Sequence, residues 1–285
     1  MNYRHAFHAG NFADVLKHIV LARILTHLGA KDAPFRVIDT HAGTGLYNLE
    51  ASEARRTGEW LEGVGLVAEN PPPARVAELI APWYGLCQGL MAQSPPLYPG
   101  SPWLAADLTR DQDRLVFCEK HPEDADRLRG NFARGKRVKV MEGDAWDLLS
   151  GLLPPPERRG LVFIDPPFEE DNEFRTISEG LAQALRRWAT GVYAIWYPIK
   201  GMREVESFAR KVAALPVAGR ILRFELSRYA VQRIDRLNGC GMIILNPPWK
   251  LDEELRAVGA YLAPLFAKEG SGLVRLDWLK QDDTP

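Results

Sequence analysis

Short apolar runs alternate along the chain with longer segments in which apolar residues recur at helical spacing. This alternation predicts an α/β fold built on a mostly parallel sheet. The short runs contain little polar alternation, which is typical of strands covered on both faces. Five such strands are expected, in this order: Phe35–Asp39, Arg114–Glu119, the beginning of Arg137–Trp146, Gly160–Ile164 and Gly191–Tyr197.

The remaining apolar pattern completes this sheet and covers it. Helical spacing is clearest from Ala13 to Leu28, and Gly29 ends it. Further helices are expected at residues 174–189, 201–214 and 250–267. The runs 221–226 and 239–245 predict a closing antiparallel hairpin, which gives a seven-stranded sheet, and 273–278 is a further edge-strand candidate.

Residues 51–101 separate the first two predicted strands by more than the helix and short loops of an ordinary βαβ unit. Their helical periodicity is broken by proline-rich stretches, which predicts a small helical insertion. We therefore expect a single domain over residues 1–285 with a helical insertion subdomain at 51–101. The insertion is interpreted either as a lid or substrate-binding element or as a passive insertion.

Composition and charge narrow the functional classes only slightly. The chain has 285 residues, 46% of them hydrophobic, and a net charge of −1, so any nucleic-acid surface must be a local patch. No apolar run approaches the ~18 residues of a membrane span, and no basic and apolar leader begins the chain, so we expect a cytoplasmic protein. Cys87, Cys118 and Cys240 are widely spaced in apolar surroundings, which predicts core thiols without a disulfide framework or a metal cluster.

The strongest candidate for chemistry follows the fourth predicted strand, where Asp165-Pro166-Pro167-Phe168 ends an apolar run. Prolines cannot donate to a ladder and stop the strand, and ligands of open α/β sheets bind at such carboxyl ends. An ordinary strand-ending turn is the alternative. Asn246-Pro-Pro-Trp249 has the same pattern, but Asp165 is preferred because the βα units before it come in the expected order.

The other predicted strands also end in polar residues. Asp39 is followed by His41, Gly43 and Gly45, a loop in which glycine allows a ligand close to the backbone. Glu119 ends the second strand, where an acid accepts hydrogen bonds from ribose hydroxyls. Asp144, after Gly143, is interpreted either as a contact to an adenine amino group or as an exposed turn acid.

The first eighteen residues are rich in histidine and basic residues, including His5, Lys17 and His18, and they also contain Tyr3. A solvated terminus is the simple interpretation, since chain ends are usually loosely held. The alternative is that the segment reaches the active site, with Tyr3 as a contact to a base and Lys17 as a contact to phosphate or to a cofactor carboxylate.

Taken with the opening segment, Tyr98-Pro-Gly-Ser-Pro102 and Trp196-Tyr-Pro198, these motifs resemble the bacterial 23S ribosomal RNA adenine-N6 methyltransferase family, RlmJ, nearly from end to end. The resemblance implies a Rossmann-like methyltransferase fold, S-adenosylmethionine as cofactor and adenine 2030 of 23S rRNA as target. It implies that Asp165 also acts at the target base. The residues implied to hold the cofactor, together with Gly43 of the loop, are His18, His41, Ser101, Glu119, Gly143, Asp144 and Asp165.

The chemistry of the Asp165-Pro166-Pro167-Phe168 motif agrees with this resemblance. The Asp165 carboxylate and the Pro166 carbonyl offer acceptors to an amino group, and Phe168 offers a ring for stacking. No metal is expected, and a monomer is expected, although the residues do not determine the oligomeric state. The competing hypotheses are an amino-methyltransferase that acts on DNA adenine or on a protein glutamine, and a non-catalytic RNA-binding module.

Overall fold

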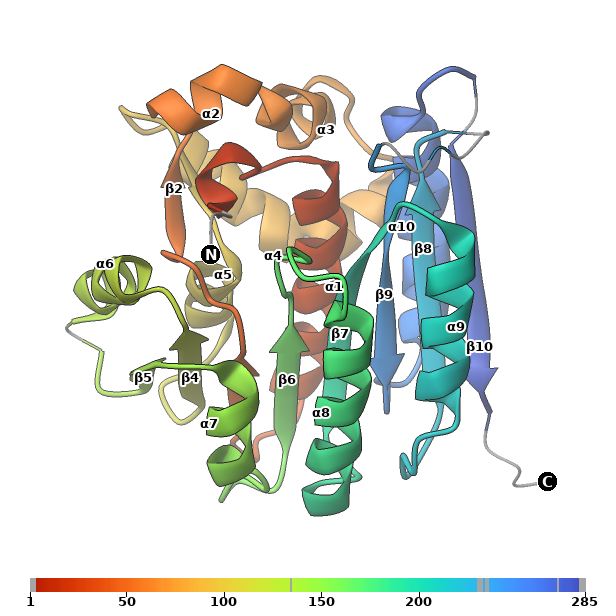
Figure 1. Cartoon of the computed structure of the whole chain (residues 1–285). Coiled ribbons are helices and arrows are strands. Elements are labelled where there is room, and N and C mark those ends of the chain that lie inside the picture. Colours follow the sequence, from red (N-terminus) through yellow and green to blue (C-terminus); the bar gives the residue numbers. More distant parts are fainter. Residues whose placement is uncertain (1–3, 134, 230–232, 234–235, 271, 282–285) are drawn as a thin grey trace.

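An eight-stranded sheet in the order β10-β8-β9-β7-β6-β1-β4-β5 forms the centre of the molecule in our computed structural model (Figure 1). The structure describes residues 4–133, 135–229, 233, 236–270 and 272–281. The parallel strands are β1 (Arg36–Asp39), β4 (Arg114–Glu119), β5 (Val138–Glu142), β6 (Gly160–Ile164) and β7 (Val192–Ile199).

An antiparallel region extends the sheet beyond β7 and consists of β8 (Ile221–Ser227), β9 (Gly239–Leu245) and β10 (Leu273–Lys280). β9 lies between β7 and β8, so the predicted hairpin closes the sheet with its second strand innermost. The mostly parallel α/β fold with a closing hairpin is confirmed. The sheet has eight strands rather than seven, because β10 pairs with β8 along its length as the outer edge strand.

Two layers of helices cover the sheet, as Figure 1 shows. One face packs against α7 (Ala145–Leu152), α8 (Glu173–Arg187) and α9 (Met202–Ala213). The other face packs against α1 (Phe12–Gly29), α5 (Ser101–Leu108), α6 (Pro122–Phe132) and α10 (Leu251–Phe266), and α4 (Ala74–Met91) packs on α1 and α10. Cys87, Cys118 and Cys240 are buried and free. None of the helices in the described ranges has the length and apolarity that a membrane crossing requires.

Helix α1 is enclosed on nearly all sides, which the sequence pattern did not predict. It packs against α4, α5 and α10 as well as against the sheet. The Asn11 side chain caps its first turn by accepting from the amides of Ala13 and Asp14. Because a buried polar group costs free energy unless it is hydrogen-bonded, the polar side chains of α1 need partners inside the protein. Arg23 has one, since it forms a two-point ion pair with Glu254 of α10.

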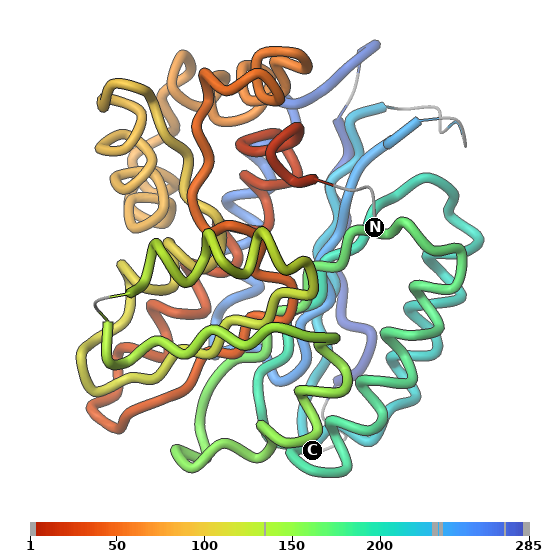
Figure 2. Tube along the Cα trace, turned by 60° about the vertical axis from the view of Figure 1, so that its left-hand side comes forward, coloured from red at the N-terminus to blue at the C-terminus, as the bar shows by residue number. Residues whose placement is uncertain are grey.

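The segment 51–101 gathers at one corner of the molecule (Figure 2). It contains α2 (Ser52–Thr57), the 3-10 helix η2 (Glu59–Glu62), α3 (Val64–Glu69), α4 and β3 (Leu97–Pro99), which pairs with β2 (Leu46–Asn48). Gly63 lies so close to the start of α1 that a Cβ there would be 2.0 Å from the Gly10 carbonyl oxygen. The segment therefore packs directly on the chain that leads into α1; its role as a separate subdomain stays a prediction.

Candidate active site

A cavity of about 870 Å³ opens at the edge of the sheet where β1, β4, β5, β6 and β7 have their carboxyl ends. This edge is at the top of the sheet in Figure 1. The beginning of α1 and the 3-10 helix η1 (His5–Phe7) form another part of the wall. The loops after the predicted strands therefore meet in one space, as their shared topology requires.

The Gly43 loop and Glu119 form one unit at this edge. The Gly43 amide donates to Oε2 of Glu119 at 2.7 Å, and the His121 amide donates to Oε1 at 2.8 Å. Gly43 has φ +59°, and a Cβ there would be 2.3 Å from the Tyr47 hydroxyl, so glycine is required. Burial raises the pKa of Glu119, and the two amides counteract that shift. Each carboxylate oxygen has further acceptor capacity for a ligand.

Gly143 and Asp144 form the neighbouring part of the wall. The Gly143 amide donates to the Glu119 carbonyl at 3.0 Å, which fixes the two loops side by side. Asp144 caps α7 by accepting from the Trp146 amide at 3.0 Å, and its other oxygen pairs with Lys120 at 3.1 Å. Burial alone would raise the pKa of Asp144, but Lys120 and the Trp146 amide hold it below its usual value.

Two histidines expected to hold the cofactor, the buried His18 and the half-buried His41, have lowered pKa values. Burial lowers the pKa of His41 to about 4 and that of His18 to about 3. Nδ1 of His18 lies 2.9 Å from the Tyr98 hydroxyl, which explains the contribution of the Tyr98 segment to the site. Ser101, the first residue of α5, is buried and lines the same wall.

Asp165 lines the cavity and is held by a chain of charged side chains from α1. Nζ of Lys17 is 2.5 Å from Oδ2 of Asp165 and 2.7 Å from Oδ1 of Asp14. Asp14 in turn lies 3.0 Å from Nε2 of His5 and accepts from the Gly10 amide at 2.8 Å. Burial alone would raise the pKa of Asp14, but the charges of His5 and Lys17 hold it well below its usual range.

The structure brings Lys17 to the predicted site but changes its interpretation. We expected a contact to phosphate or to a cofactor carboxylate, and its ammonium group instead joins two carboxylates of the protein. The side chain of Lys17 is 6% exposed, so the pairing compensates for buried charge. Tyr3 lies outside the described residues, and its predicted role at the base stays a prediction.

The prolines and Phe168 complete the wall beyond Asp165. Phe168 has φ +52°, a left-handed conformation that is costly for a bulky residue. Its ring makes edge contacts with Phe174 at 5.0 Å and with Trp196 at 5.8 Å between centroids. Backbone strain of this kind persists where surrounding packing fixes it, and it clusters at functional sites.

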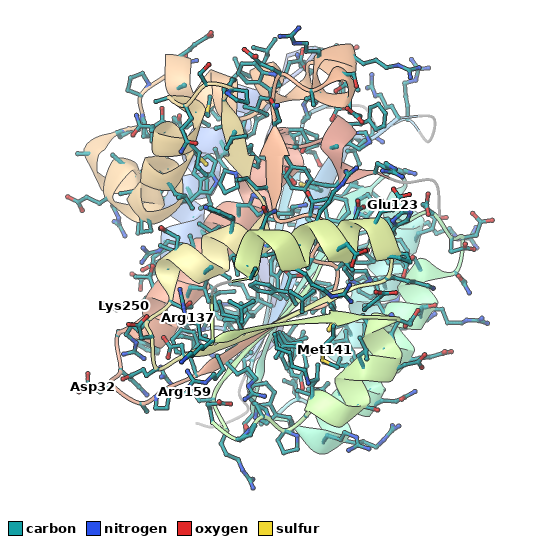
Figure 3. The ribbon with its side chains drawn as sticks, turned by 90° about the vertical axis from the view of Figure 1, so that its left-hand side faces the viewer. Asp32, Glu123, Arg137, Met141, Arg159 and Lys250 are labelled. Carbon is teal, nitrogen blue, oxygen red and sulfur yellow. The ribbon has the colours of Figure 1, made fainter. Side chains whose placement is uncertain are left out.

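The second tetrapeptide, Asn246-Pro-Pro-Trp249, lies at the other edge of the sheet. It follows β9, which runs antiparallel to β7 and pairs Leu245 with Tyr193 near the start of β7. Lys250, directly after the tetrapeptide, appears in Figure 3 on the side that carries Asp32 and Arg159, away from Glu123. The preference for Asp165 over Asn246 therefore agrees with the geometry.

Two residues of the site were missed by sequence reasoning. Asp14 was overlooked because an acid three residues before a lysine on a helix usually forms an exposed ion pair, whereas its side chain here is 1% exposed. Lys120, which pairs with Asp144, had a weak signal in its position directly after Glu119.

Comparison with known proteins identifies the family of the chain. The model of the family described as "Ribosomal RNA large subunit methyltransferase D, RlmJ" matches residues 32–280. The chain belongs to this family. The resemblance found in the sequence motifs is thereby confirmed at the level of the family, which is one of ribosomal RNA methyltransferases.

Individual relatives of this RlmJ-family chain cover nearly its whole length. It is 37% identical over 280 residues to "Ribosomal RNA large subunit methyltransferase J" of Escherichia coli (strain K12), covering 98% of this chain and 99% of that protein. The protein of the same name from Haemophilus influenzae has the same identity and coverage. A crystal structure of a Legionella pneumophila protein, 35% identical, superposes with a TM-score of 0.85 over 95% of this chain and 98% of that one.

Proposed function

We propose that the protein transfers a methyl group from S-adenosylmethionine to the N6 amino group of an adenine in 23S ribosomal RNA, at position 2030 by resemblance to its family. One observation carries the proposal. Asp165-Pro166-Pro167-Phe168 ends the buried strand β6 in the same cavity as Gly43, Glu119 and Asp144. A site suited to an amino group and a site suited to a nucleoside therefore share one space.

The residues of the cavity fit the cofactor. Glu119 presents a carboxylate to ribose hydroxyls, the Gly43 loop permits close approach, and Asp144 can accept from an adenine amino group. His18 and His41 are neutral near pH 7, so they add no positive charge beside a cationic sulfonium. When bound, the cofactor supplies an activated methyl group, and the protein contributes orientation and electrostatics.

Asp165 and Pro166 act on the target nitrogen. An adenine N6 lone pair is delocalised into the ring, so the amino group is a poor nucleophile until the nitrogen becomes more tetrahedral. The Asp165 carboxylate and the Pro166 carbonyl accept from its two N–H groups, which localises the lone pair. The rigid prolines keep the carbonyl in place.

Lys17 acts as a positioning residue for this step. Its ammonium group, fixed by Asp14, holds one oxygen of Asp165 and leaves the other for the amino group. Lys17 also lies 5.6 Å from the centroid of the Trp196 ring, which contacts Phe168. Lys17 therefore contacts both the Asp165 carboxylate and the Trp196 ring that packs on Phe168.

Phe168 supplies a surface for the target base. The rings of Phe174 and Trp196 make edge contacts with the Phe168 ring at interplanar angles of 66° and 76°, and these contacts fix its orientation. Stacking of a base on an aromatic ring contributes ~1–3 kcal/mol in proteins that bind single strands. A base turned out of its stack would thus be held between the ring of Phe168 and the acceptors of Asp165 and Pro166.

Mass spectrometry of 23S rRNA tests the proposal. In a strain that lacks the gene, we expect loss of one N6-methyladenosine from a fragment that contains adenine 2030. The wild-type gene should restore it, and the Asp165→Asn gene should not. Methylation of a protein glutamine or of DNA adenine by the purified protein, with none on rRNA, would replace this function with one of the competing hypotheses.

A further inference from the structure

The rim of the cavity has a different charge on each side of Asp165. Gly43, Glu119 and Asp144, which are expected to hold the cofactor, lie at the carboxyl ends of β1, β4 and β5. Asp165 follows the neighbouring strand β6. Beyond it, β7 ends at Ile199 and is followed by Lys200. The ends of the β8–β9 connection lie at the same edge, since Ser227 and Ile199 both pair with Gly239. The cofactor residues and this connection are thus on opposite sides of Asp165.

The segment that leaves β6 toward α8 forms an acidic rim. Glu169, Glu170 and Glu173 all line the cavity. Burial raises the pKa of Glu173, and the neighbouring charges of Glu170 and Asp144 raise it further, so these carboxylates lie close together. A polyanion such as RNA is repelled from this rim.

The described residues that follow β7, and those near the two ends of the β8–β9 connection, form a basic rim. Lys200 is exposed, lines the cavity, and has no carboxylate partner among the residues that the structure describes. Arg228 and Lys268 share one carboxylate, that of Glu62, at 3.0 and 2.8 Å. Among the described residues of this rim, the acids Glu62 and Glu269, of which Glu269 pairs with Arg236 at 3.5 Å, are outnumbered by the cations Lys200, Arg228, Arg236 and Lys268.

A buried asparagine fixes the basic rim as one unit. The Asn238 amide nitrogen donates to the carbonyls of Lys200 at 2.9 Å and Arg233 at 2.6 Å. Its oxygen accepts from the Arg233 amide at 3.0 Å and from Nε of Arg236 at 3.2 Å. Asn238 has no exposed surface, so it ties Lys200, Arg233 and Arg236 of this rim together beside β7.

We propose that the RNA backbone next to the target nucleotide crosses the basic rim, with Lys200 as its phosphate contact nearest the cavity. This inference rests on the proposed function for the identity of the substrate as RNA. It adds the direction of approach: the strand runs over β7, β9 and β8, away from the cofactor residues and the acidic rim. Phosphate contacts of this kind fix the position of the nucleic acid without reading its sequence.

The test is the salt dependence of RNA binding by Lys200→Ala. We expect weaker binding and a plot of log K against log salt that is shallower by about 0.7–0.9, the change for one lost phosphate contact. Lys211→Ala is the matched control, because Lys211 is exposed on α9 and lies outside the cavity lining. Affinity for S-adenosylmethionine should be the same in both variants.

The opposite rim gives an independent second variant. Glu170→Gln removes one negative charge from the acidic rim and should leave RNA affinity unchanged or raise it slightly. If instead Lys200→Ala leaves affinity and salt slope at wild-type values, or Glu170→Gln weakens binding, the RNA does not follow the basic rim and the inference is wrong.

Two RNA probes separate this inference from the proposed function. One is a 23S rRNA fragment that contains the target adenine, and the other is a single-stranded oligoadenylate. A shallower salt slope for Lys200→Ala on both probes, without methyl transfer by the wild type, would support RNA binding at the basic rim and reject the proposed function. Methyl transfer by the wild type with a normal KM for Lys200→Ala would support the function and reject the rim.

Discussion

The two Pro-Pro-aromatic turns of this protein have nearly the same sequence and entirely different surroundings. Asp165 ends a parallel strand, faces a cavity and is paired with Lys17 of α1. Asn246 ends an antiparallel strand at the other edge, and its amide donates to the carbonyls of Ala189 at 2.9 Å and Gly191 at 2.6 Å. The Asn246 side chain holds a turn together, whereas the Asp165 side chain is held by others and presented to a ligand.

The difference shows that strand direction, more than the tetrapeptide, determines what such a turn can do. A parallel strand ends where the neighbouring strands also end, so its last polar residue joins those of the other loops. An antiparallel strand such as β9 ends at the edge where β7 begins. Trp249 therefore follows a strand that ends at the opposite edge of the sheet from the residues expected to hold the cofactor. Its ring is exposed, although its motif matches that of Phe168.

Replacement of the acid is expected to have the largest effect. Asp165→Asn is near-isosteric, but its amide can present N–H groups to the target amino group, which needs acceptors. We expect methyl transfer in a single turnover to slow by roughly 10²–10³-fold, the effect of losing one preorganised hydrogen-bond partner in other enzymes. Rapid-quench kinetics measures it, and the matched change Asn246→Asp should leave the rate at the wild-type value.

Loss of the ammonium group that organises the site should affect both rate and stability. Lys17→Met leaves Asp14 and Asp165 without their shared cation, and breaking a buried pair by removing one partner costs about 3–5 kcal/mol. Urea unfolding measures this loss. The double variant Asp14→Asn/Lys17→Met should recover part of the stability but none of the rate. Full recovery of the rate would show that Lys17 has no role in methyl transfer.

The turn at Asn246 should show the reverse behaviour, a change in stability without a change in rate. Asn246→Ala removes the side-chain donor to the Gly191 carbonyl, and removes one of two donors to the Ala189 carbonyl, which keeps the Ala218 amide at 3.2 Å. An unsatisfied acceptor costs about 1–3 kcal/mol. We expect a lower free energy of unfolding with an unchanged rate of methyl transfer per folded molecule. A rate lowered as much as that of Asp165→Asn would mean that the two turns are not functionally different.

The smallest expected effect is on the pH dependence of the free energy of unfolding. It comes from His18, in the part of α1 that lines the cavity. The pKa of His18 is about 3 in the folded protein and ordinarily about 6.5, so the unfolded state binds more protons between these values. Stability therefore falls as the pH drops below 6.5, by about 2 kcal/mol at pH 5 for this residue.

His18→Gln should flatten that dependence, and urea unfolding at several pH values measures it. Burial raises the pKa of Asp39 to about 7, which gives a slope of opposite sign in the same range. The difference between wild type and variant removes the contribution of Asp39. An unchanged dependence in His18→Gln would show that folding does not shift the pKa of His18.

Sequence alone could predict the strand ends because their arrangement follows from topology. Glu119, Asp144 and Asp165 each follow a predicted parallel strand, and parallel strands share an edge. The contact between Lys17 and Asp165 could not be predicted, since 148 residues separate them and helical periodicity does not say that α1 is enclosed on all sides. Burial is what turns Asp14 and Lys17 from an ordinary helical ion pair into the support of the site.

Identification of the methylated nucleoside tests the central claim most directly. Purified wild-type protein, S-adenosylmethionine with a deuterated methyl group and unmodified 23S rRNA are incubated, and the RNA is digested to nucleosides for mass spectrometry. The account predicts one labelled N6-methyladenosine per rRNA with wild type and Asn246→Asp, and none with Asp165→Asn in the same time. Label on another atom or nucleoside, or equal label with Asp165→Asn, would contradict it.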